Sequence, residues 1–151
     1  MPKINLQHKT HPTAGYAEKY WFENEFTGLK RTLFHRICLP LHPFDSGLEY
    51  EPQPLETEIV IEWLDLALPN PDDLHNLRIS SQHYGSLEAS VYVGGAHNIC
   101  EVLRLNIHSM EADTYAIDGE LYIDFKSEGV AENETFSFQS VVQYTGFAND
   151  K

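Results

Sequence analysis

The sequence lacks a long apolar run and contains little cysteine. No window approaches the length of a membrane helix, and the opening residues, MPKINLQHKTHPTAG, hold no apolar stretch of signal-peptide length. These absences predict a cytoplasmic protein without a membrane partner. The two cysteines, Cys38 and Cys100, both lie in apolar strand patterns. We therefore expect two reduced, buried thiols rather than a disulfide.

Positive charge is also scarce. The chain has 10 Lys and Arg against 23 Asp and Glu, which gives a formal net charge of −13. Such a surface repels phosphate backbones, so we expect no direct contact with nucleic acid. Residues 37–77 contain no Lys or Arg but nine Asp and Glu. This asymmetry predicts a surface that attracts a basic protein partner, and solubility alone is the alternative explanation.

Motifs of the common enzyme classes are absent as well. The sequence has no phosphate-binding Gly-rich loop, dinucleotide fingerprint, nucleophile elbow, zinc-spaced Cys pair or zincin helix. His8 and His11 have a spacing that could chelate a metal, but no Cys or carboxylate beside them completes a site. We therefore expect no cofactor and no bound metal, and the sequence favours a protein without catalytic activity.

The clearest pattern that is present is TYAIDGELYIDFK, residues 114–126. In an extended strand, alternate side chains point to opposite faces of a sheet. One face of this strand would carry only apolar side chains, namely Tyr115, Ile117, Leu121, Ile123 and Phe125. The other face would be polar. Strands with one apolar and one polar face are typical of antiparallel sheets.

Seven further segments show extended patterns between turn signals. They are residues 16–26, 29–39, 56–68, 77–81, 87–93, 99–110 and 134–145. The alternation in 56–68 breaks near Leu64, which predicts a bulge or a change of sheet, and Gly94-Gly95 predicts a hairpin turn. In residues 99–110 we expect Leu105 and Ile107 to share a face with Ile99 and Leu103.

These segments predict an all-β fold. The expected architecture is an antiparallel β-sandwich or barrel of about eight strands with little or no long helix. The length is that of one domain, 1–151, in which residues 1–15 would form a flexible arm or an edge strand. His35 shares its face with apolar residues and is expected to be a hydrogen-bonded core residue.

The candidate binding region combines a loop and a turn. Residues 40–55 carry four prolines, and a loop of this length in a compact domain is usually functional or mobile. The glycines before His97 would let a ligand approach the backbone, and Asn98 adds a donor and an acceptor. The candidate partner-binding or ligand-binding residues are His42, Phe44, Asp45, Glu49, Tyr50, Glu51, His97 and Asn98.

Three functional hypotheses follow. The first is a non-enzymatic module that binds a basic protein, of which an immunity-like or antitoxin-like protein would be one form by analogy. The second is a β-sandwich or barrel that binds a small ligand or sugar. The third is an unfamiliar enzyme that uses His97 or the carboxylate face of Asp118, Glu120 and Asp124. A sheet edge near residues 16–26 could also pair two copies into a homodimer.

Overall fold

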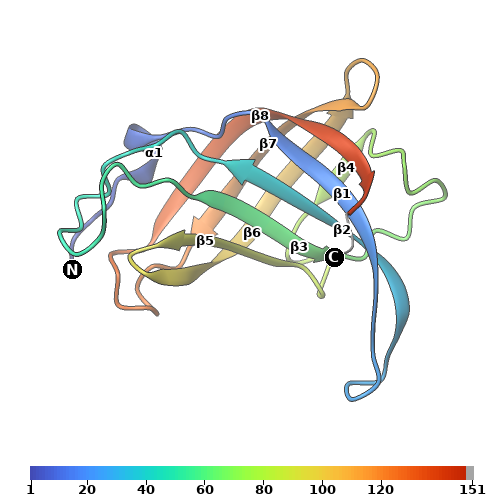
Figure 1. Cartoon of the computed structure of the whole chain (residues 1–151), viewed down its shortest axis with the longest axis horizontal. Coiled ribbons are helices and arrows are strands. Elements are labelled where there is room, and N and C mark those ends of the chain that lie inside the picture. The colour runs from blue at the N-terminus through green and yellow to red at the C-terminus, as the bar shows by residue number, and fades with distance from the viewer. Residues whose placement is uncertain (149–151) are drawn as a thin grey trace.

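The protein is mostly β, and the computed structural model describes residues 1–148 (Figure 1). The strands are β1 Gly15–Asn24, β2 Leu29–Pro40, β3 Glu58–Leu64, β4 Leu77–Ile79, β5 Glu88–Val93, β6 Ala96–Ser109, β7 Thr114–Ile123 and β8 Glu134–Phe147. The all-β prediction with about eight strands is therefore confirmed. The single domain stays a prediction, and its last residues, 149–151, lie outside the described part.

One sheet closes on itself into a barrel. Its strand order is β4-β6-β5-β3-β2-β1-β8-β7, and β6 also pairs with β7. Seven strands, β1–β3 and β5–β8, thus form a closed ring. The three-residue β4 is an additional strand that pairs with β6 further along that strand than β5 does. All pairs are antiparallel except β1 with β8. Closure matters because it removes the long unpaired edges that an open sheet would expose.

Alternating side chains fill the barrel. The expected apolar face of β7 is buried, and it meets large side chains from β8 such as Phe136 and Phe138. The face prediction for residues 99–110 is wrong, because the ladder shifts register between Val102 and Arg104. Cys100 and Val102 point inward before the shift, and Leu105 and Ile107 point inward after it. Ile99 and Leu103 are consequently exposed on the outside of the barrel.

Two predicted irregularities are present. Gly94 and Gly95 both have positive φ, and they form the two-residue turn between β5 and β6 that favours glycine at both positions. The register between β2 and β3 shifts beyond Ile61, where Trp63 adopts a left-handed conformation with φ 57°. This local change turns Leu64 into the core, as the break in the sequence pattern predicts.

The N-terminal segment closes one end of the barrel, at the left in Figure 1. The short helix α1, Leu6–Lys9, inserts the fully buried Leu6, and the backbone amides of Asn5 and Leu6 donate hydrogen bonds to the Glu134 carboxylate at 3.1 and 2.6 Å. The expected edge strand or flexible arm over residues 1–15 is therefore wrong for this helical segment. No helix in residues 1–148 is long and apolar enough to cross a membrane.

Replacement of Leu6 by Ala should destabilise the fold strongly. The change removes a fully buried side chain from the closed end of the barrel, and we expect the free energy of unfolding to fall by about 2–5 kcal/mol. Urea denaturation followed by tryptophan fluorescence measures this loss. The matched control is Leu103→Ala, at a leucine that is 40% exposed, and it should change stability by about 0.5 kcal/mol or less. Equal effects of the two variants would contradict the packing of α1.

Candidate functional site

The loop of residues 40–55 covers the same barrel end as α1. Phe44 and Leu48 are buried in the core, so the expectation that Phe44 contacts a partner is wrong. Glu51 accepts hydrogen bonds from the Ser46 hydroxyl at 2.6 Å and from the Gly94 amide at 2.9 Å. The structure therefore brings this loop against the β5–β6 turn, as the ligand hypothesis requires. These hydrogen bonds of Glu51 have a structural role, because they hold the loop over the end of the barrel.

Other candidate residues of the loop lie on its surface. His42, Glu49 and Tyr50 are exposed, and the His42 ring stacks on His11 at 5.4 Å. Asp45 accepts a hydrogen bond from the Gly47 amide and thereby stabilises a turn. These side chains remain accessible at the outside of the closed end, but the structure shows no shared polar contact among them.

His97 and Asn98 point to opposite sides of the sheet. Asn98 is fully buried, and its side-chain amide donates to the carbonyls of Val91, Val93 and Ala96 at 3.0–3.1 Å. The expectation that Asn98 assists the imidazole at a ligand is therefore wrong, because neighbouring residues of a strand face opposite ways. His97 lies outside, where its ring meets Tyr92 edge-on at 4.8 Å.

The three carboxylates of the expected catalytic face have separate partners. Asp118 accepts from Arg104 and from Asn106, both at 3.0 Å. Glu120 accepts from the Ser137 hydroxyl at 3.2 Å, and Asp124 binds the amide and hydroxyl of Ser127. These Ser127 hydrogen bonds lower the pKa of Asp124. Within residues 1–148, no group of three or more His, Cys, Asp or Glu side chains is placed to hold a metal.

A shallow groove runs along the outer face of β3 and β5. One hollow of about 460 Å³ is lined by Pro40, Glu56, Thr57, Glu58, Val60, Ser90, Tyr92 and His97, and an adjoining one of about 300 Å³ by Val60, Glu62, Glu88, Ser90 and His97. Val60, Ser90 and His97 belong to both, so the two hollows are continuous. We call this surface the acidic groove, because four glutamates line it.

The glutamates of the acidic groove are not equivalent. Arg36 on β2 binds Glu62 at 3.0 Å and Glu18 at 2.8 Å, so these two carboxylates share one positive charge. Glu56, Glu58 and Glu88 have no ion pair with any residue of the described chain. The groove therefore presents uncompensated negative charge beside the apolar side chain of Val60 and the ring of Tyr92.

Cys38 faces outward from β2, yet it is almost completely buried. Burial raises the pKa of Cys38, and burial raises that of Cys100 to about 12. Both cysteines are free, which confirms the expectation of two unpaired, buried thiols. Neither thiol is positioned as a nucleophile, because a nucleophilic cysteine needs a stabilised thiolate.

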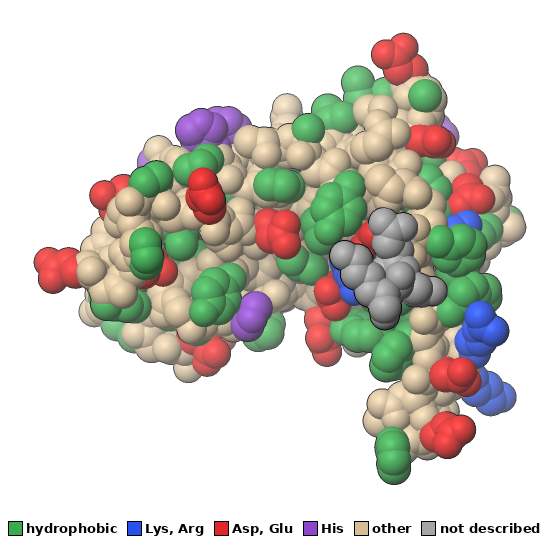
Figure 2. Space-filling view, viewed as in Figure 1, with side chains coloured by type: hydrophobic (Ala, Val, Ile, Leu, Met, Phe, Trp, Pro, Cys, Tyr) green, Lys and Arg blue, Asp and Glu red, His purple; other side chains and the backbone are tan. Residues whose placement is uncertain are grey.

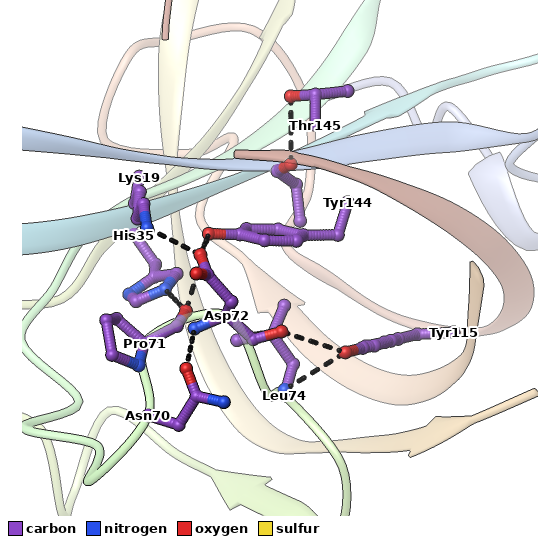
Figure 3. A network of polar contacts seen from close by, with 10 residues as sticks. Lys19, His35, Asn70, Pro71, Asp72, Leu74, Tyr115, Tyr144 and Thr145 are labelled. Carbon is purple, nitrogen blue, oxygen red and sulfur yellow. Dashed lines mark hydrogen bonds and ion pairs between the residues drawn. The ribbon is translucent and has the colours of Figure 1, made fainter. Parts of the chain in front are cut away.

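The opposite barrel end holds a polar cluster that the sequence analysis missed (Figure 3). Lys19, buried and inward-facing on β1, binds the Asp72 carboxylate at 2.5 Å, and the Tyr144 hydroxyl donates to the same oxygen at 2.5 Å. His35 Nε2 lies 2.8 Å from the Pro71 carbonyl oxygen. Tyr115 accepts from the Leu74 amide at 3.3 Å. We call these five side chains the barrel-end cluster.

The barrel-end cluster holds residues 71–74 against the end of the barrel. Its contacts converge on residues 71–74, whose Leu74 side chain is buried in the core. Lys19 and Tyr144 lower the pKa of Asp72, and burial together with Asp72 raises that of Tyr144. The phenol therefore remains a hydrogen-bond donor. The Lys19 ammonium is held in an ion pair and also lies 4.3 Å from the centre of the Phe147 ring, so it is not a free nucleophile.

His35 is a satisfied core residue at only one of its two ring nitrogens. A carbonyl oxygen can only accept, so Nε2 carries the proton, and the buried Nδ1 has no partner among the described residues. Burial lowers the pKa of His35, and the positive charge of Lys19 acts in the same direction. One signal in the sequence could have predicted this cluster. Lys19 alternates with the buried Ala17 on β1, so a lysine occupies an inward-facing position of the strand.

Comparison of the chain with family models, with curated proteins and with solved structures gives no match.

We expect His35 to make stability depend on pH below about 6.5. The unfolded chain binds a proton at this residue near that pH, whereas the folded protein, with its lowered pKa, does not. Acidification from pH 7 to 5 should therefore destabilise the wild type more than His35→Gln, whose side-chain amide can still donate to Pro71. The difference should approach about 1.4 kcal/mol per pH unit.

Urea denaturation at pH 7, 6 and 5 measures this linkage. His97→Gln, at an exposed histidine, serves as the matched control and should follow the wild type. If the stability of the wild type and of His35→Gln fell equally with pH, neutral His35 would not be what holds residues 71–74 in place.

Proposed function

We propose that this protein is a non-enzymatic binding module that holds a basic protein partner against the acidic groove. The observation that carries the proposal is the position of Glu56, Glu58 and Glu88, which have no ion pair in the described chain and surround an apolar floor. Carboxylates without partners beside apolar area suit Lys and Arg side chains, whose stems are apolar and whose ends are charged.

The composition of the groove supports a cationic rather than a neutral ligand. Tyr92 is exposed, and its ring offers a face to a cation next to the glutamates. The net charge of −13 adds long-range attraction, which raises the rate of encounter with a basic protein and weakens as salt is added. An immunity-like or antitoxin-like protein is one form of such a module, by analogy with small acidic domains that cover basic targets.

The other hypotheses find less support in the geometry. An enzyme based on His97 would lack Asn98, which faces the interior, and the carboxylates of β7 are each engaged elsewhere. A small ligand inside the barrel would have to displace core side chains such as Phe125 and Phe136. The expected cytoplasmic location is part of the proposal, and two free, buried cysteines fit a reducing compartment.

Removing two of the glutamate charges from the acidic groove should weaken capture of the partner. We expect the wild type to retain a basic protein from a lysate of its source organism at low salt and to release it at high salt. The double variant Glu58→Gln with Glu88→Gln should fail to retain this protein at either salt concentration. Bound proteins are identified by mass, and the affinity for the captured protein is then measured by titration. Removal of two contact charges should weaken binding about tenfold or more.

The control removes the same charge elsewhere. Glu111 and Glu128 lie exposed in the turns that follow β6 and β7, and Glu111→Gln with Glu128→Gln should keep the partner. Equal losses in the two double variants would mean that net charge alone causes retention. Capture of no basic protein by the wild type at low salt would overturn the proposed function.

A further inference from the structure

The β1–β2 hairpin extends beyond the barrel, at the lower right in Figure 1. The pairing of β1 with β8 ends at Lys19, and the pairing of β2 with β3 begins at His35. Between these points, residues 20–24 and 29–34 pair only with each other among the described strands. We call residues 20–34 the ribbon. A two-stranded ribbon with both edges unpaired is marginally stable alone and is a template for another strand.

The ribbon carries aromatic side chains that the fold does not cover. Phe26 at the turn is fully exposed, Trp21 is 48% exposed and Phe22 is 37% exposed. Single exposed apolar residues are ordinary on protein surfaces, whereas three within six residues on a projecting hairpin form a patch. A hollow of about 320 Å³ beside the β1 edge is lined by Tyr20, Trp21, Phe22, Glu23, Arg31, Phe147 and Ala148.

The base of the ribbon is held in a fixed direction. The Trp63 ring meets Phe22 at 4.8 Å, Phe34 at 5.3 Å and Tyr20 at 5.7 Å, each edge-on. Trp63 itself stands where β3 leaves its regular ladder with positive φ. A pre-organised surface of this kind loses little conformational entropy when a partner binds.

The charge of the ribbon identifies the partner. Residues 20–34 contain Glu23, Glu25, Lys30 and Arg31, so their formal charge is zero, whereas the whole chain carries −13. In Figure 2 this projecting hairpin, at the lower right, carries both basic (blue) and acidic (red) side chains. A basic protein would be attracted to the acidic groove instead. Because the charge of the ribbon is balanced, a second, equally acidic copy meets less repulsion there than at the acidic groove.

We propose that the ribbon is the contact surface of a twofold homodimer, in which the β1 edges of two copies pair antiparallel around Phe22. In this register Trp21 of each copy faces Glu23 of the other. Arg31 already lies over the Trp21 ring at 4.8 Å, so the incoming carboxylate would meet a guanidinium. The same patch serves both copies, as a twofold interface requires. The acidic groove is not used in this contact.

Removal of the exposed rings should dissociate the dimer. We expect the wild type to change from monomer to dimer with concentration in sedimentation equilibrium, and we expect Trp21→Ser with Phe26→Ser to raise the dimer dissociation constant about 30-fold or more. Neither ring belongs to the cluster around Trp63, so the variant should keep the melting temperature of the monomer. The matched control, Ile99→Ser with Leu103→Ser, removes exposed apolar residues from β6 and should leave the dimer intact.

A charge exchange tests the register. Glu23→Arg and Arg31→Glu should each weaken the dimer, and the two together should restore it relative to either single variant. A wild type that stays monomeric at all concentrations overturns the proposal, and so does a dimer that the β6 control breaks and the ribbon variant does not. A double variant weaker than both singles overturns the twofold pairing. None of these results depends on the captured partner of the acidic groove.

Discussion

The pairing of β6 with β7 is the constraint on which the rest of the structure depends, because it closes the sheet into a barrel. A closed ring of seven strands has an interior that side chains fill and two open ends that must be covered. At one end Leu6 and Phe44 come from segments outside the ring. At the other end Leu74 does so, and the barrel-end cluster holds its segment in place. Both coverings are therefore consequences of closure.

Closure also determines where function can reside. Segments outside the ring cover both ends and side chains fill the interior, so the two binding surfaces that we propose lie on the outer face of the sheet and on the strands that leave the ring. The acidic groove lies on that outer surface, across β3 and β5, and the ribbon is the part of β1 and β2 that extends past their neighbours. Except for His35 Nδ1, the polar side chains of the barrel-end cluster contact one another or the covering segment, so they contribute to holding that segment in place.

The alternation of apolar and polar residues was enough to predict the fold class and the strand positions, because a strand with one buried face has apolar residues at every second position. It failed for residues 99–110, since an irregularity in the ladder near Arg104 exchanges the faces and leaves no local signal. The candidate site was harder to predict. His97 does line the acidic groove, but Asn98 beside it is a core residue. Glu58 and Glu88 come to line the same groove only because β3 pairs with β5, and the sequence does not specify this pairing.

The acidic groove and the ribbon should respond to salt in opposite directions. Screening weakens the attraction between the groove and a basic partner, and it also weakens the repulsion between two copies that each carry −13. The dimer contact that we propose is mainly aromatic, and burial of apolar surface is not lost on screening. A basic partner bound in the groove would reduce the net negative charge of the molecule. Like salt, it would therefore weaken the repulsion between two copies. Occupation of one surface would then favour the other without any change in the fold, because the coupling is carried by the charge of the whole molecule.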